Sequence, residues 1–171
     1  MRFGKNYQTG SSLIEIAVTI IIVATGLLGL AGLQANSARF LKTANQRSEA
    51  TQAAYDISER MRANGAGVKA NNYTYTTSYA STIASVPTIP SCSGSTCLAS
   101  EIAAIDINTW LVNLAYKLNG GAGYIVANAV GSYDITVMWQ EAGYADVDLA
   151  CPTGAGAPGA GVRCFVVRTN P

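Results

Sequence analysis

One uninterrupted apolar run dominates the first fifth of the chain. No charged residue occurs between Ile16 and Leu33, and at the rise of an α-helix this run would extend about 27 Å. That length is close to the thickness of the hydrocarbon core of a bilayer, so the pattern predicts a membrane-spanning helix. One carboxylate, Glu15, directly precedes the run. Since an acid at mid-membrane costs roughly 2.5 to 3.5 kcal/mol, we expect Glu15 to have a partner or a task.

The apolar pattern continues past Leu33 in the phase of the same helix, but on one face only. Asn64-Gly65 then provides a typical helix end. We therefore expect one helix from Ser11 to Ala63, with a first half that suits lipid and a second half that packs on a domain. A secretory signal, in contrast, would end at a cleavage site after its apolar region. The apolar positions of the second half are Phe40, Ala44, Ala50, Ala54, Ile57 and Met61.

Three glycines, Gly26, Gly29 and Gly32, lie within the apolar half of this helix. Small residues allow two membrane helices to approach closely. Glycine also weakens a helix by about 1 kcal/mol per residue relative to alanine, so a bendable stretch is the alternative interpretation.

The remainder of the chain predicts an α+β domain. A second helix is expected where Asp106 can cap a run with Trp110 on its apolar face and an Asn-Gly-Gly end. Residues 71–90 indicate a loop with an irregular edge strand. Three further runs are rich in β-branched and aromatic residues and predict an antiparallel sheet packed on the long helix, in the shape of a ladle with the N-terminal half as handle. These strand-like runs are 123–130, 132–140 and 161–169.

Composition narrows the function classes. The net charge of the 171-residue chain is only +1, which argues against an electrostatic nucleic-acid site. Histidine is absent, and with it the commonest general base and the commonest zinc ligand. We therefore expect no catalytic residue, no metal and no cofactor, and a protein that is not an enzyme.

Four cysteines form two pairs that are close in sequence, Cys92 with Cys97 and Cys151 with Cys164. Without histidine or a CxxC spacing, two disulfides are favoured over a zinc site. Three connectivities are possible for four cysteines, and short loop closure favours the local pairs. Disulfides would place the domain in an oxidising compartment.

The N-terminal motif resembles a known signal. A short basic leader ends in Gly10, a small residue Ser11 follows, and Glu15 is the fifth residue after that junction. This arrangement resembles the class III signal of type IV pilins and of type II secretion pseudopilins. The resemblance implies that a prepilin peptidase cuts between Gly10 and Ser11 and methylates Ser11, while the apolar helix is kept. It also implies that the Glu15 carboxylate offsets the charge of an N-terminal amine during assembly.

Longer stretches resemble PilV-type minor pilins. The shared features are a leucine-glycine end of the apolar helix, an acid-x-x-x-Trp helix ending in glycines at 106–121, and the "ITV-W" strand at 135–139. Two positions depart from major pilins, since Gly32 stands where they often carry proline and Ser11 where they usually carry phenylalanine. The first departure bears on helix melting in the filament, and the second on peptidase efficiency and methylation.

The resemblance implies a minor type IV pilin that primes pilus assembly and is incorporated near the pilus tip. Twitching motility, adhesion and DNA uptake would be its consequences. The implied partners are other minor pilins, the major pilin, the prepilin peptidase, the inner-membrane assembly platform and a tip adhesin. The protein would cross the bacterial inner membrane once, with its head in the periplasm, before it joins the extracellular pilus. The expected segments are a cleaved leader at 1–10, a hydrophobic helix at 11–33, an amphipathic half at 34–64 and a head at 65–171.

Two alternatives remain. A minor pseudopilin of a type II secretion system would use the same helix in a shorter filament. A membrane-anchored enzyme is less consistent with a sequence whose acids look like scattered surface residues. The segment from Glu141 to Asp148 contains oxygen ligands of the kind that calcium prefers, but it has no EF-hand spacing, and a solvated loop is favoured. The acids in question are Asp106, Asp134, Glu141, Asp146 and Asp148.

Overall fold

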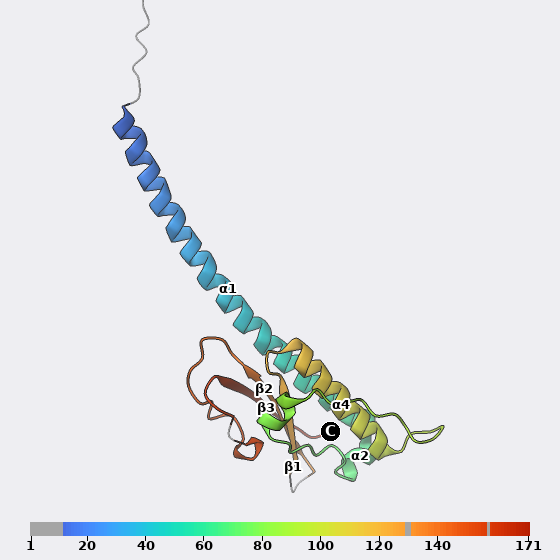
Figure 1. Ribbon diagram of the computed structural model, residues 1–171. Helices are drawn as coiled ribbons and strands as arrows, with labels where there is room; N and C mark the ends of the chain where they lie inside the picture. The colour runs from blue at the N-terminus through green and yellow to red at the C-terminus, as the bar shows by residue number, and fades with distance from the viewer. Residues whose placement is uncertain (1–11, 129–130, 157) are drawn as a thin grey trace, which may run out of the picture. The chain divides into compact units, whose positions relative to one another are not determined.

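The computed structural model describes residues 12–128, 131–156 and 158–171. Its contacts divide the chain into two compact units, Met1–Lys42 and Thr43–Pro171, and the division falls within the first helix. We call the second unit the head. The elements, labelled in Figure 1, are α1 (Leu13–Ala63), α2 (Gly65–Lys69), α3 (Tyr79–Ala84), α4 (Ala99–Lys117), β1 (Ala122–Ala127), β2 (Tyr133–Gln140), the 3-10 turn η1 (Thr153–Ala155) and β3 (Val162–Thr169).

Helix α1 confirms the predicted long helix up to its last residue, Ala63. Its first described residue is Leu13, and the expected start at Ser11 lies outside the described residues. Asn64 ends α1 and at the same time caps α2, because its side-chain oxygen accepts a hydrogen bond from the Gly67 N–H at 3.2 Å. Asparagine favours helix caps over helix interiors, which explains why Asn64 separates the two helices.

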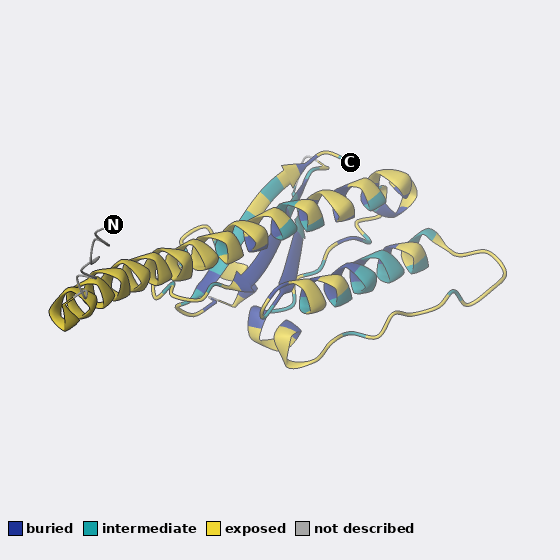
Figure 2. Cartoon of the chain, turned by 90° about the horizontal axis from the view of Figure 1, so that it is seen from above, coloured by how far each residue is buried: buried dark blue, intermediate teal, exposed yellow. Residues whose placement is uncertain are grey.

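In the first unit, every described residue up to Lys42 is exposed, as the yellow N-terminal part of α1 in Figure 2 shows. Phe40 is 76% exposed, and Ala44, just inside the head, is also exposed. The expectation that these two residues begin a buried stripe is thus wrong. The burial of α1 starts at Gln46, whose side-chain amide donates to the carbonyl of Gln140 at the end of β2.

The sheet of the head is an antiparallel meander in the order β1-β2-β3. Tyr133 of β2 pairs with Ala127 of β1 and with Thr169 of β3. Each strand is therefore hydrogen-bonded to the next strand in sequence. Alternate residues of β2 point to opposite faces. One face packs on α1 and α4, while Met138 on the other face packs with α3 and the segment around η1. The three predicted strands and the predicted α+β architecture are confirmed.

The main core lies between the sheet, α4 and the part of α1 within the head. Trp110 is fully buried there, and its indole N–H donates to the carbonyl of Ala53 at 2.9 Å. A Cβ on Gly123 of β1 would overlap the Trp110 ring, so a glycine is needed where the strand passes this side chain. The largest fully buried side chains are Trp110, Tyr73, Tyr133, Ile57, Met61, Leu111, Leu114, Ile125, Ile135, Met138, Val137 and Thr136.

Helix α4 begins seven residues earlier than the pattern predicts. Leu98 is the N-cap residue, and the carboxylate of Glu101 in the first turn accepts from the Leu98 N–H at 2.8 Å and from the N–H and hydroxyl of Ser93. Asp106 therefore does not cap a helix, and the expectation that it does is wrong. It lies within α4 and accepts a 2.6 Å hydrogen bond from the hydroxyl of Tyr73.

Residues 71–90 form no extended edge strand in the described structure. Tyr75 makes a single two-way backbone bridge with Ile125 of β1, with N···O distances of 2.9 and 2.7 Å. The chain then enters α3, a short helix that the pattern did not predict, capped by the hydroxyl of Ser78. After α3, residues 85–98 lie outside any helix or strand.

Candidate functional site

The apolar half of α1 is the first candidate site. Its most apolar window has a mean hydropathy of 2.5 and is fully exposed, so by length and composition α1 can cross a membrane. Soluble proteins rarely leave large contiguous apolar surfaces open to water. This surface therefore requires lipid or other protein chains as its environment. The exposed large apolar residues of the half are Leu13, Ile14, Ile16, Val18, Ile20, Ile21, Ile22, Val23, Leu27, Leu28, Leu30 and Leu33.

The polar side chains within the apolar half satisfy their hydrogen bonds locally. The hydroxyl of Thr19 donates to the carbonyl of Ile16 at 2.8 Å, and that of Thr25 donates to the carbonyl of Ile22 at 2.9 Å. Since hydrocarbon offers no partner for a hydroxyl, such bonds to the preceding turn lower the cost of placing threonine there. The two threonines are thus compatible with a lipid environment.

Glu15 lies in the first turn of α1, where its backbone N–H donates to the Ser12 carbonyl at 2.9 Å. A carboxylate at this end of a helix interacts favourably with the exposed backbone N–H groups. Gly10 and Ser11, the predicted cleavage and methylation positions, lie outside the described residues.

The three glycines of the apolar half are not required by contacts within the chain. A Cβ added to Gly26, Gly29 or Gly32 would meet nothing within 4 Å. Their small size thus has no role in the folding of the described chain, and both close packing with other helices and local bending remain interpretations of it.

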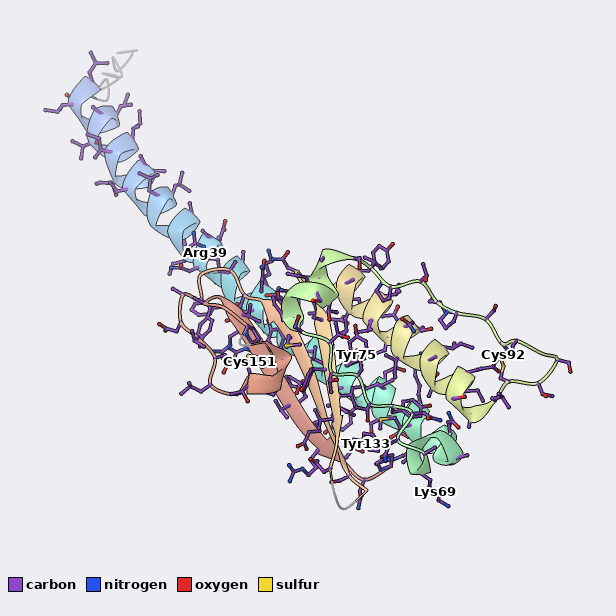
Figure 3. The ribbon with its side chains drawn as sticks, turned by 60° about the horizontal axis from the view of Figure 1, so that its bottom comes forward. Arg39, Lys69, Tyr75, Cys92, Tyr133 and Cys151 are labelled. Atoms are coloured by element: carbon purple, nitrogen blue, oxygen red, sulfur yellow. A yellow bond between two sulfur atoms is a disulfide. The ribbon has the colours of Figure 1, made fainter. Side chains whose placement is uncertain are left out.

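Both disulfides link the cysteines that are neighbours in sequence. Cys92 is bonded to Cys97 and Cys151 to Cys164, with Cα–Cα separations of 5.1 Å in each case, and no free cysteine remains. Figure 3 shows Cys92 and Cys151 on opposite sides of the head. Cys164 belongs to β3, so the second disulfide attaches the long β2–β3 connection to the sheet. Closing a loop of this size contributes about 3 kcal/mol in the chain-entropy model.

Two acids of the β2–β3 connection lie beside the guanidinium group of Arg163. The Nε atom of Arg163 lies 3.6 Å from a Glu141 oxygen and 3.5 Å from an Asp148 oxygen, and the guanidinium is 4.3 Å from the centre of the Tyr144 ring. Asp148 also accepts the backbone N–H of Cys164 at 3.1 Å. No group of three or more potential metal-ligating side chains occurs in the described part of the chain. Arg163 thus pairs with two of the three acids in the segment for which calcium was the alternative, Glu141 and Asp148.

A buried polar network, which the sequence pattern did not reveal, lies at the end of α1. The Tyr73 hydroxyl accepts from Asn64 at 3.2 Å and donates to Asp106, which also faces Arg60 at 3.4 Å. Burial, and then the hydrogen bond to Asp106, raise the pKa of Tyr73 well above its usual value of 10.0. Tyrosine and aspartate 33 residues apart carry no sequence signal of contact, so only the fold brings them together.

Asp134, another of the expected acids, has a structural partner. Asp134 forms a two-bond pair with Arg168, with N···O distances of 2.6 and 2.8 Å, and these hydrogen bonds lower the pKa of its carboxyl. Trp110 and Trp139 are buried. A groove of about 340 Å³ between α1 and α4 is lined by acids that pair with Arg60 and Lys117. We find no nucleophile with an adjacent base among the described residues that line it.

These observations define a class of protein: an α+β head on a helix that is apolar enough to cross a membrane. A family model described as Tt1218-like, Type IV pilin Tt1218, matches residues 32–108, somewhat less than half of the chain. The match begins in the apolar half of α1 and ends within α4. No curated protein and no solved structure matches the chain significantly. The family match, together with the fold, supports a type IV pilin and pilin-type assembly.

Proposed function

We propose that this chain is a PilV-like minor type IV pilin. In this proposal it is a structural subunit without catalytic activity that joins other minor pilins and the major pilin, primes pilus assembly and is incorporated near the tip. It contributes in this way to twitching motility, adhesion and DNA uptake. The observation that carries the proposal is α1, in which an exposed apolar half continues without a break into a half that buries one face in the head.

A helix of this kind serves two successive environments. Before assembly, the bilayer covers its apolar half and anchors the subunit in the inner membrane, with the head in the periplasm. In the filament, the apolar halves of neighbouring subunits would cover one another. Transfer between two apolar environments costs little hydrophobic free energy, because neither state exposes the surface to water. The two disulfides fit a periplasmic and then extracellular head.

The proposal includes processing by a prepilin peptidase. The mature chain then begins at Ser11, carries an N-methyl group and retains the whole of α1. Mass spectrometry of the N-terminal peptide from protein made in its natural host tests this expectation. An intact Met1, or a cut after the apolar half, would contradict the pilin assignment.

Glu15 separates an assembly subunit from a simple membrane anchor. We propose that its carboxylate pairs with the N-terminal amine of an adjacent subunit. Glu15→Ala should then insert and lose its leader normally, because it removes a charge that costs roughly 2.5 to 3.5 kcal/mol at mid-membrane. It should co-purify less with partner pilins, since removing one member of a buried ion pair costs on the order of 3 to 5 kcal/mol.

Glu15→Gln is the matched variant, because it preserves the shape of the side chain and removes only its charge. Both variants are compared with wild type for membrane insertion, for recovery of partner pilins after detergent extraction, and for the number of surface pili. If both enter filaments at wild-type levels, charge pairing by Glu15 is wrong for this protein. A failure of insertion itself would instead point to an anchor that depends on the carboxylate.

A further inference from the structure

A short apolar protrusion lies in the connection between β2 and β3. Leu149 is 96% exposed there and Val147 is 57% exposed. Among the large apolar side chains of the described head, Leu149 is the most exposed. We call residues 146–151 the finger. Because single exposed apolar residues are common on protein surfaces, the meaning of this one depends on how the finger is held and where it lies.

The finger is fixed to the start of β3 by its own polar groups. The carbonyl of Asp146 accepts from the Gly161 N–H at 3.1 Å, and the carboxylate of Asp148 accepts from the Cys164 N–H at 3.1 Å. The disulfide between Cys151 and Cys164 closes its other side. The two apolar side chains are thus presented by a backbone that is ordered in advance. Such a surface loses little conformational entropy when it binds.

The finger lies at the end of the head where α1 enters it. Glu141, at the start of the same connection, is 3.5 Å from Arg47 of α1, and Gln46 donates to the carbonyl of Gln140. We call this end, residues 43–49 of α1 and the segments that contact them, the proximal end. Only residues 34–42 connect it to the apolar run that ends at Leu33, and as part of α1 they rise by about 14 Å.

That distance is comparable with the depth of a membrane surface. The polar interfacial region on each side of a bilayer is roughly 5 to 8 Å thick. Membrane helices are also tilted by about 20° on average, which lowers one side of an attached domain toward the lipid. If the apolar half of α1 spans a bilayer, the proximal end is therefore the part of the head that faces the lipid surface.

The proximal end exposes the residue types that are typical of a membrane interface. Tyr116, near the end of α4, is 81% exposed. The next residue, Lys117, pairs with Glu49 of α1 at 3.4 Å, which places this end of α4 at the proximal end. Lys117 and Arg47 are both exposed. Tyrosine is enriched at the headgroup level of membrane proteins, and cations there attract anionic lipids.

The charges of α1 favour a lipid surface over a second copy of the chain. Arg39, Lys42 and Arg47 are the only charged residues at positions 16–48, so this stretch contains no acid. A second copy that docked by the same end would bring like charges together, which is unfavourable. Anionic phospholipid headgroups, in contrast, are complementary to these cations.

We propose that the finger docks the head on the surface of an anionic phospholipid bilayer, with Val147 and Leu149 in the interfacial region. The inference rests on the membrane anchoring of α1 in the proposed function and adds a second, weaker contact made by the head. This contact holds the proximal end against the membrane before assembly and is released when the subunit enters a filament. Asp146 is exposed within the finger, and its negative charge opposes the docking.

The test uses the full chain in vesicles of equal parts phosphatidylethanolamine and phosphatidylglycerol, with a small share of phospholipid that carries a doxyl quencher near its headgroup. Tyr116→Trp supplies a fluorescent reporter at the proximal end, and the spectrum of the chain without this substitution is subtracted. We expect the reporter emission to be quenched and to lie at shorter wavelength than in detergent micelles. In this background Leu149→Asp should reduce both effects, and Asp146→Asn should increase them.

Leu98→Asp, in the same reporter background, is the matched control. Leu98 is also an exposed leucine, but it precedes Ala99, whose carbonyl accepts from Asn64 just after the last residue of α1. It therefore lies at the other end of the head, and its replacement should leave the quenching unchanged. Replacing phosphatidylglycerol by phosphatidylcholine should weaken the quenching, and equal quenching in both lipids would refute the assignment to an anionic surface.

An unquenched reporter would overturn the proposal, and so would quenching that Leu149→Asp leaves unchanged or that Leu98→Asp reduces equally. A wavelength shift that appears only with partner pilins and persists in detergent would assign the finger to a protein contact and overturn it as well. Flotation of the chain with the vesicles reports the anchoring by α1 separately. A chain that floats with an unquenched reporter would refute this inference alone, whereas a chain that does not float would refute the membrane anchor too.

Discussion

Gly123 offers a sharp test of the packing between the sheet and α4. Gly123→Ala would place a Cβ in steric overlap with the ring of Trp110, 3.0 Å from its Cε3 and closer still to Cζ3 and Cη2. Neither side yields readily, because Gly123 is paired with Val137 in the sheet and the Trp110 indole is anchored to the Ala53 carbonyl. Inserted methylenes in well-packed cores cost about 1 to 3 kcal/mol. We expect the upper part of that range.

Thermal unfolding of the full chain in detergent, followed by near-ultraviolet circular dichroism, measures the effect. At about 4 °C per kcal/mol for a domain of this size, the midpoint should fall by roughly 8 to 12 °C. Gly65→Ala is the matched control, because its Cβ would meet nothing within 4 Å. In a Trp110→Phe background the same Gly123→Ala change should cost much less, since the atoms that clash are gone. Equal costs in both backgrounds would refute the packing argument.

Three further predictions follow from the loops and the polar network. Replacing Cys151 and Cys164 by serine should lower the free energy of unfolding by about 3 kcal/mol, as measured by urea titration. Replacing Cys92 and Cys97 by serine should lower it by less, because their disulfide closes a shorter loop. The pKa of Glu101 is lowered, first by the hydrogen bond from Ser93 and then by that from the Leu98 N–H. The free energy of unfolding should therefore fall as the pH drops below about 4.5. Glu101→Gln should reduce this pH dependence. The raised pKa of Tyr73 means that stability should fall as the pH rises above 10, a loss that Tyr73→Phe should reduce.

The long helix and the three strands were predictable because each shows a clear local pattern of apolar and polar residues. Eighteen residues without a charge, a helical stripe from Ala50 to Met61, and strands such as 133–140 leave few alternatives. The local disulfides were also predictable, because among the three possible connectivities the one that closes the shortest loops costs the least entropy. These features depend on neighbours in sequence, which a single chain displays directly.

What could not be predicted depends on distant partners. Helical phase places Phe40 on the stripe but cannot show that the core reaches only as far as Gln46. The start of α4 depends on Glu101, which binds a serine eight residues earlier, so a capping search near Asp106 misses it. The hydroxyl of Tyr73 likewise finds its acceptor 33 residues away.

The polar network at the end of α1 also bears on how the head holds its own helix. Arg60 belongs to the last turn of α1, Asn64 lies between α1 and α2, Tyr73 lies in the loop after α2, and Asp106 belongs to α4. Asp106 has a side chain only 13% exposed, so moving α1 away from α4 would break its ion pair with Arg60, a loss that adds to that of the apolar contacts. Ala50, Ala54 and Ile57 would be uncovered by the same movement, because they share one core with the sheet. A pull along this part of α1 must therefore break the apolar core and the polar network together.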